Sequence, residues 1–435
     1  LLTLASYVGA GEIVGWRSDG SGRYEKAIPP TKWSQEENVV WKAELPGGGY
    51  GSPVLVGKRI FVTSEPAELL CFDAATGEFL WQRSHSHVDV YGETLGQQIE
   101  EEYARLQERR DELRRQYNEM RKADPQAKDN LQTQQEKINN VDQQINDKKQ
   151  EHAPPIHRGG AGNAASTPVS DGQHVWAVFG HGVVSCHDLD GKRRWLTFVE
   201  GANIGFGHSS SPVLADGNLI VHFDTLVALD AANGKTRWQK ELPARHATPT
   251  PLRIDGMHVL LTPSGSLLQA DTGDVLVEKI CSLSECSAVL RDGVVYLQGN
   301  KTCALRVPKT IQAEANFDSL WESQSSRGRR TPSPVYNDGL LYGITTAGIL
   351  DVTDAVTGEE VYRKRLGLKN VYSSITSAGD YLFISGTRGT TIVLKPGRKY
   401  EEVARNELEA FGSCLVFVGR KMYVRTRKHL YCIGE

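Results

Sequence analysis

A repeating pattern of short apolar strands and tight turns constrains the fold of this chain more than any other feature. One unit of the pattern runs from Ser52 to Trp81 and predicts four strands joined by a turn, a short loop and a second tight turn. Related units begin at Thr167, Ser211, Thr248, Ser287, Ser333, Ser374 and Ser413, and from the second unit onward the starts lie about 37 to 46 residues apart. A four-stranded blade of a β-propeller has this length. The sequence therefore predicts an all-β fold, an eight-bladed β-propeller.

A tight turn before the last strand recurs in several units, although the fourth, fifth and seventh lack its full form, and it explains how the blades fit together. Asp73–Gly77 recurs at Asp230–Gly234 and Asp354–Gly358, with a shortened form at Asp188–Gly191. Aspartate bonds its own downstream backbone in such turns, and glycine supplies the positive φ. A large aromatic ring follows about eight residues after the aspartate, at Trp81, Trp195, Trp238 and Tyr362. We expect these rings to pack between neighbouring blades.

The last unit ends after three predicted strands, at about Ile433. The stretch Asn38–Leu45, which precedes the first full unit, has the pattern of the missing fourth strand. We expect it to pair with Tyr431–Ile433, complete the eighth blade and close the ring, which removes exposed sheet edges.

The repeated Asp-x-x-Thr-Gly-x-x-x-Trp pattern, seen from Asp73 to Trp81, resembles the quinoprotein-like propeller repeat. That repeat occurs in pyrroloquinoline-quinone (PQQ) alcohol dehydrogenases and in the propeller lipoprotein of the bacterial outer-membrane barrel-assembly machinery. The resemblance covers the chain except for one insertion. It implies the fold, but it does not choose between an enzyme and a scaffold, because the family contains both.

The insertion, from about Glu93 to His152, has almost no glycine and is rich in Gln, Glu, Arg and Lys. Its apolar residues, from Ile99 to Met120 and again from Leu131 to Ile145, follow alternating spacings of four and three, and Pro125 lies in the break between them. This predicts an α-helical hairpin, an antiparallel coiled coil of two helices of about 25 residues. The functional interpretation is an arm that docks a partner or mediates oligomerisation, and the alternative is a solvated decoration.

The chain accordingly divides into four parts. Residues 1–37 form an N-terminal segment and 38–92 hold the closing strand and the first blade. Residues 93–152 form the hairpin and 153–435 hold blades two to eight. The first ten residues are either the remnant of a signal peptide or an ordinary first strand. The segment from Trp16 to Gly22 has the character of a cap rather than of a site.

One face of the predicted propeller gathers unusual polar residues. The hairpin springs from this face, where the connections into the inner strands and the short second-to-third-strand loops also emerge. The candidate residues for binding a ligand or partner are Tyr50, Asn163, His181, His208, Arg245, His246, Arg329, Arg330, Tyr372 and Arg388. They predict a basic, imidazole-rich rim around the central channel that suits an anionic group or an acidic peptide. The alternative is that His208 and His246 satisfy buried backbone groups at blade junctions.

The sequence offers little sign of catalysis or of a cofactor. A formal charge of −3 predicts no general attraction to nucleic acid, and no run reaches the ~18 apolar residues of a membrane span. The quinone dehydrogenases of the family use calcium, a catalytic aspartate and often an adjacent-cysteine disulfide. No Cys-Cys pair occurs in this sequence, and no calcium-binding acidic set is evident. We therefore predict no catalytic residue, metal site or cofactor, and keep PQQ with calcium as the alternative.

These observations favour an exported protein, periplasmic or secreted, that binds a protein partner through its channel face and its hairpin. Two alternatives stay open, a PQQ-dependent oxidoreductase and a sensor of a small ligand or carbohydrate.

Overall fold

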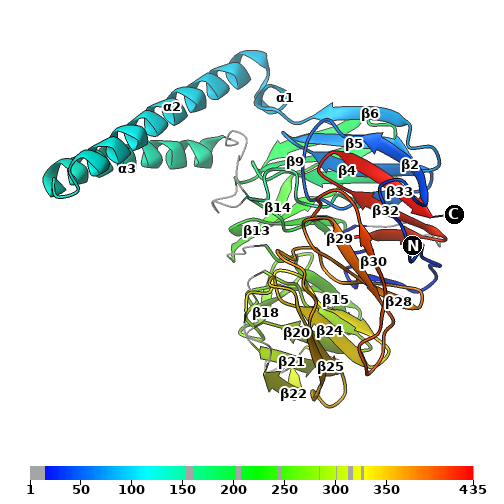
Figure 1. Cartoon of the computed structure of the whole chain (residues 1–435). Helices are drawn as coiled ribbons and strands as arrows, with labels where there is room; N and C mark the ends of the chain where they lie inside the picture. The colour runs from blue at the N-terminus through cyan, green and yellow to red at the C-terminus, as the bar shows by residue number, and fades with distance from the viewer. Residues whose placement is uncertain are drawn as a thin grey trace.

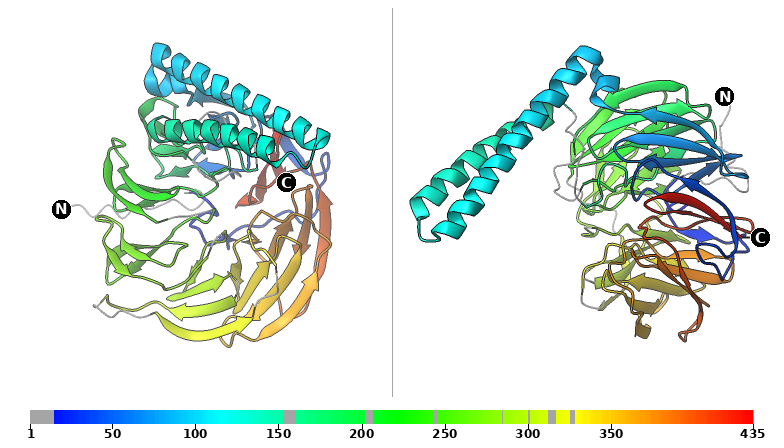
Figure 2. Two further views of the ribbon diagram at one scale, coloured as in Figure 1. Left: turned by 90° about the vertical axis from the view of Figure 1, so that its left-hand side faces the viewer. Right: turned by 45° about the horizontal axis from the view of Figure 1, so that its top comes forward.

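A computed structural model of the chain describes residues 15–152, 160–201, 207–242, 246–283, 285–299, 301–311, 317–324 and 328–434. The strands among these residues form eight sheets arranged in a ring around a central axis (Figures 1 and 2). This confirms the eight-bladed propeller.

In each of blades one to seven, four consecutive strands run antiparallel from the axis to the outer edge. Blade one holds β3 (Val54–Val56), β4 (Arg59–Ser64), β5 (Glu68–Asp73) and β6 (Phe79–Ser84). Blades two and three hold β7 (Val169–Ser170), β8 (His174–Val178), β9 (Val183–Asp188), β10 (Arg193–Phe198), β11 (Val213–Ala215), β12 (Asn218–His222), β13 (Thr225–Asp230) and β14 (Thr236–Glu241). Blades four and five hold β15 (Thr250–Ile254), β16 (Met257–Leu261), β17 (Leu267–Gln269), β18 (Val275–Val277), β19 (Val289–Arg291), β20 (Val294–Gln298), β21 (Lys301–Arg306) and β22 (Asp318–Gln324). Blades six and seven hold β23 (Val335–Asn337), β24 (Leu340–Ile344), β25 (Ile349–Asp354), β26 (Glu360–Arg365), β27 (Thr376–Ala378), β28 (Tyr381–Ser385), β29 (Thr390–Leu394) and β30 (Glu402–Glu407).

The eighth blade joins the two ends of the chain, as the sequence predicted. It holds β31 (Val416–Val418), β32 (Lys421–Arg425) and β33 (His429–Gly434) from the C-terminal end, and β2 (Val39–Glu44) is its outer strand. β2 runs antiparallel to β33, with Trp41 opposite Cys432 and Ala43 opposite Leu430. A further short strand, β1 (Arg23–Tyr24), runs parallel to β27 on the inner edge of blade seven. The ring is therefore closed by backbone hydrogen bonds.

Tryptophans on outer strands dock onto the neighbouring blade. The Trp238 indole Nε1 donates to the Ala270 carbonyl at 3.1 Å, and the ring lies against Gly273 so closely that a Cβ there would meet it at 2.6 Å. The same arrangement, an indole bonded to a turn carbonyl beside a positive-φ glycine, recurs for Trp41, Trp81, Trp195 and Trp321. Glycine is needed because a side chain would occupy the place of the ring. The predicted packing of rings between blades is thus present.

The insertion is a helical hairpin between β6 and β7. It consists of α1 (His87–Tyr91), α2 (Glu93–Ala123) and α3 (Lys128–Glu151), and Figure 1 shows α2 and α3 side by side, extending away from the ring. Near the ring the two long helices bury a small apolar cluster of Ile99, Tyr103, Val141 and Ile145. Within the described parts of the chain, no helix combines the length and apolar character that crossing a membrane requires.

Candidate functional site

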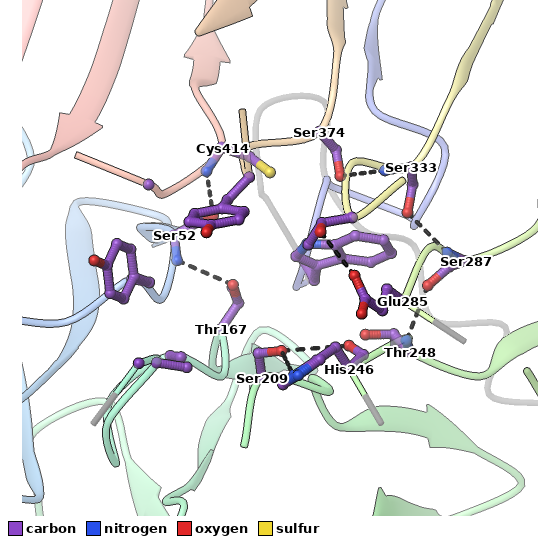
Figure 3. Close-up of a pocket in the computed structure, with 18 of the residues that line it drawn as sticks. Ser52, Thr167, Ser209, His246, Thr248, Glu285, Ser287, Ser333, Ser374 and Cys414 are labelled. Atoms are coloured by element: carbon purple, nitrogen blue, oxygen red, sulfur yellow. Dashed lines mark hydrogen bonds between the residues drawn. The ribbon is translucent and has the colours of Figure 1, made fainter. Parts of the chain in front are cut away.

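A belt of hydroxyl groups lines the channel and links neighbouring blades to one another. In seven of the eight blades, the residue two positions before the inner strand donates its backbone N–H to the side chain of the equivalent residue in the following blade, at 2.8–3.0 Å (Figure 3). The belt residues are Ser52, Thr167, Ser211, Thr248, Ser287, Ser333, Ser374 and Cys414. Serine and threonine suit this position because a short hydroxyl both accepts and donates.

The eighth position of the belt corrects the register taken from the sequence. The sequence placed the start of this unit at Ser413, but the Ser413 hydroxyl bonds the Arg425 carbonyl within its own blade, at 2.8 Å. Cys414 instead donates its N–H to Ser52, at 3.0 Å. Within the described residues no N–H is bonded to the Cys414 thiol, so the belt is interrupted between blades seven and eight.

Above the belt lies a cavity of about 430 Å³ on the channel axis. Its wall includes six of the belt hydroxyls, the aromatic residues Trp16, Tyr50 and Tyr372, and the polar groups of Ser209, His246, Glu285, Arg329, Thr331 and Arg427. Most of these residues come from connections that enter inner strands, whereas Trp16 belongs to the N-terminal segment and Arg427 to the loop between β32 and β33; Figure 3 shows how the labelled residues surround one space. The volume is in the range of small-molecule sites.

Trp16 reaches the cavity because Arg17 fastens the N-terminal segment inside the ring. The fully buried Arg17 guanidinium donates to the carbonyls of Pro334 at 2.7 Å and Ile375 at 3.0 Å, which belong to blades six and seven. A Cβ on Gly15 would touch Val169 of blade two, so the segment spans the channel. The prediction of a cap is consistent with this path, but Trp16 also lines the site, which the sequence analysis missed.

Two charged contacts shape the electrostatics of the cavity. Glu285 Oε2 accepts from Arg329 Nε at 2.6 Å and from the Thr331 hydroxyl at 2.9 Å. On another side, Arg427 donates to the Tyr50 hydroxyl at 2.6 Å and stacks on that ring. Glu285 is the one acidic residue among the described residues of the wall. It offsets the charge of Arg329.

The ten residues singled out from the sequence separate into four groups. Tyr50, His246, Arg329 and Tyr372 line the cavity, whereas Arg388 is exposed and does not line it. Four others are buried in contacts within the protein: Asn163, His181, His208 and Arg330. Arg245 lies outside the described residues.

The buried members of this set serve the scaffold. His181 Nε2 lies 2.8 Å from the His85 carbonyl, and burial lowers the pKa of His181 to about 4. His208 stacks on Phe223 with ring centroids 4.0 Å apart. Burial is the main cause that lowers the pKa of His208 to about 3, and the nearby His222 and His246 lower it further by charge repulsion. Arg330 pairs with the buried Asp351. His181 and His208 are therefore buried and neutral at pH 7, whereas His246 lines the cavity.

The hairpin is rooted on this same face. Ser86 caps α1 through a reciprocal pair of hydrogen bonds with Asp89, and Asp89 also lies 3.5 Å from Arg193 of blade two. After the hairpin, the backbone N–H groups of Asn163 and Ala164 donate to Glu65 Oε1, at 2.7 and 2.9 Å. Gly160 and Ala161 of this returning segment line the cavity. The hairpin and the cavity thus share a structural element.

The cavity does not suit a calcium-bound quinone. Calcium takes six to eight oxygen ligands, usually including several carboxylates. The wall offers Glu285, which Arg329 and Thr331 already engage, and the described residues contain no group of three His, Cys, Asp or Glu side chains placed to hold a metal.

The ring of eight blades, with its repeated Asp-to-Gly turn and docked tryptophan, is a propeller of the PQQ-like repeat class. The sequence model of the family described as outer membrane protein assembly factor BamB matches residues 31–97 and 180–434. The chain belongs to this family. Most of the hairpin lies in the unmatched stretch between the two segments.

Similar proteins include members of that family and enzymes. The outer membrane protein assembly factor BamB of Yersinia pestis is 25% identical over 248 residues, which cover 53% of this chain and 61% of that protein. The BamB structure from Moraxella catarrhalis aligns with a TM-score of 0.60 and 12% identity, over 91% of this chain and 97% of that one. The quinohemoprotein alcohol dehydrogenase of Comamonas testosteroni aligns with a TM-score of 0.57 and 10% identity, over 99% and 82% of the respective chains. The two structural similarities show a shared fold.

Proposed function

We propose that the protein is a non-catalytic scaffold, exported to the bacterial periplasm, that binds a protein partner during assembly of outer-membrane proteins. Family membership supports the setting, since the matching family is described as an outer-membrane assembly factor. The chemistry of the cavity supports a binding role, because Glu285, the one carboxylate among the described residues of its wall, is engaged by Arg329 and Thr331.

The observation that carries the proposal is the joint construction of hairpin and channel face. Glu65 anchors the segment that returns from the hairpin, and this segment contributes Gly160 and Ala161 to the cavity wall. In the left-hand view of Figure 2, which looks along the channel, the hairpin lies in front of the ring. A partner that lies along the hairpin would therefore also reach the channel mouth, and we propose Tyr50, His246, Arg329 and Tyr372 as its contacts there.

The hairpin itself is built to remain ordered in solvent. Gln134 Nε2 in α3 bonds the Leu113 carbonyl of α2 at 3.2 Å, and Arg114 and Lys148 form cross-helix ion pairs with Asp142 on α3 and Glu102 on α2 respectively. Leu95 is the one exposed large hydrophobic residue among its described side chains. We propose that this polar surface serves a reversible contact, which is more polar than a permanent interface, and that oligomerisation through the hairpin is the competing outcome.

A shortened hairpin tests the proposal. Residues 108–138 are replaced by a short glycine-containing turn, which keeps the cluster of Ile99, Tyr103, Val141 and Ile145 at the base. Tagged full-length and shortened proteins are used to capture partners from solubilised envelopes of the source organism, and affinity for each captured protein is then measured with purified components. We expect at least a tenfold loss of affinity, with the thermal unfolding midpoint of the ring unchanged.

Two controls separate the hairpin from the ring. The exposed Arg388, which lies off the cavity, is changed to alanine and should bind as the native protein does. Size-exclusion light scattering of both hairpin forms reports the oligomeric mass. Unchanged partner affinity in the shortened protein contradicts the proposal, and a fall in mass without any change in partner affinity favours the oligomerisation alternative.

A further inference from the structure

Six hydroxyl groups of the belt line the cavity, and each has a proton that it can donate to a ligand there. Each accepts one backbone N–H from the preceding blade, and within the described residues none of the six donates its own proton to a protein acceptor. All six residues are at most 7% exposed and line the cavity: Ser52, Thr167, Thr248, Ser287, Ser333 and Ser374. A hydroxyl that has accepted one bond still donates one, so these groups form a ring of donors around one space.

On the same cavity wall as these donors, Glu285 supplies a hydrogen-bond acceptor for a ligand. Its side chain is 11% exposed, and both of its protein hydrogen bonds, from Arg329 and Thr331, end on Oε2. Oε1 has no hydrogen-bond partner within the described residues. Figure 3 shows Glu285 among the residues that surround the cavity. An ionised carboxylate accepts strong hydrogen bonds from hydroxyl groups, and Oε1 is free to do so.

Aromatic faces complete the wall. Trp16, Tyr50 and Tyr372 line the same space, and the Trp16 indole makes no hydrogen bond within the described residues. Trp and Tyr combine a flat apolar surface with a polar edge. A ligand that fits must therefore have one apolar face and several hydroxyl groups at its edge.

The charges of the cavity favour a ligand that is neutral overall. Arg329 is neutralised by Glu285, and Arg427 lies at the exposed rim, bonded to the Tyr50 hydroxyl. We infer that the cavity is a saccharide site, in which a sugar ring stacks on the aromatic residues while its hydroxyl groups bond Glu285 Oε1 and the hydroxyl belt. The volume of about 430 Å³ admits one or two sugar rings. The site shares Tyr50, Arg329 and Tyr372 with the proposed partner contacts at the channel mouth, and binding of the saccharide and of the partner is tested by separate measurements.

A binding survey with defined variants tests the inference. The intact protein is applied to a glycan microarray, and the best neutral oligosaccharide is titrated by calorimetry. We expect saturable binding with one site per chain, weakened at least tenfold in Glu285→Gln and in Trp16→Phe. The control is Arg388→Ala, which changes an exposed arginine outside the cavity, beside the turn between the second and third strands of blade seven. This variant should bind the oligosaccharide as the native protein does. The thermal unfolding midpoint of each variant is measured, and Glu285→Gln is chosen because it preserves the shape of the side chain.

Three results would overturn the inference. The first is that the folded native protein binds no glycan on the array. The second is that the variants bind as tightly as the native protein, which places the site elsewhere. The third is that only glucuronate, sulfate and similar anions bind, and that Arg427→Ala abolishes this binding, which makes the cavity an anion site. Loss of partner capture in the hairpin variant is measured separately, so failure of one proposal leaves the other intact.

Discussion

Exchanging Gly273 for alanine tests whether the docked tryptophans hold neighbouring blades together. Gly273 has a φ of +75°, and a Cβ there would lie 2.6 Å from Trp238 Cδ2. Gly256, in another turn of the same blade, has a φ of +76° and no atom within 4 Å of the Cβ position. The two substitutions share the backbone cost of a left-handed residue, about 1–2 kcal/mol. They differ only in what the added methyl group meets.

The difference between the two variants measures the docking contact. In Gly273→Ala the indole must retreat, which weakens its 3.1 Å bond to the Ala270 carbonyl and overpacks the junction. A lost hydrogen bond costs about 1 kcal/mol and overpacking about 1–3 kcal/mol. Gly273→Ala should therefore destabilise by about 2–4 kcal/mol more than Gly256→Ala.

Urea unfolding followed by far-ultraviolet circular dichroism measures both variants, provided that the slopes agree with the native protein. The same pair is then made in a Trp238→Ala background, where the excess cost of Gly273→Ala should vanish. Equal destabilisation by the two alanines in the native background would refute the docking argument. So would an excess that survives removal of the indole.

Three further changes test other parts of the structure. Burial lowers the pKa of His85, His181, His187, His208 and His222, so between pH 6.5 and about 4 the unfolded chain binds protons that the folded chain excludes. The free energy of unfolding should therefore fall by up to ~1.4 kcal/mol per pH unit for each of these histidines as the pH is lowered. A urea unfolding midpoint that stays constant from pH 7 to pH 5 would contradict this expectation. Arg17→Met leaves the Pro334 and Ile375 carbonyls without their donor, and should cost about 2 kcal/mol in thermal or urea unfolding and speed proteolysis of the N-terminal segment. Glu65→Gln replaces a carboxylate that accepts the backbone N–H groups of Asn163 and Ala164, so hydrogen exchange of these two amides should become faster. Unchanged exchange rates would show that the segment following the hairpin is not held in place by Glu65.

The fold was predictable because its signals are local. The Asp-to-Gly turn and the tryptophan that follows it within one blade lie a few residues apart, and each has a direct physical meaning in the structure. The closing strand was predictable for a related reason, since a blade with three strands has an unpaired edge that the only spare strand can fill. The register of the eighth blade was misread because Ser413 and Cys414 stand side by side, and serine is the more typical belt residue.

The site was less predictable because its residues depend on contacts distant in sequence. The positions of the histidines in the repeat placed them on one face but could not tell whether the imidazoles point outward, and His181 and His208 proved to be buried. The position of Trp16 depends on Arg17, whose partners Pro334 and Ile375 lie more than 300 residues away. A Trp-Arg pair beside several glycines was the available signal, and it indicates a fixed segment only once those carbonyls are known.

The chemistry of the channel face arises where the eightfold repeat is broken. The repeat supplies the belt, a nearly uniform ring of hydroxyl groups, and a uniform ring has no reason to orient a ligand. The features that distinguish one side of the cavity from another come from outside the repeat: Trp16 from the N-terminal segment, Gly160 and Ala161 from the end of the insertion, and the Glu285–Arg329 pair from connections between blades. Because blade stability depends on the belt and the docked tryptophans, these added groups are free to change without cost to the ring. Specificity in this protein should therefore follow the cavity-facing side chains of the irregular segments, and substitutions of those side chains, unlike Arg17→Met, should alter binding more than stability.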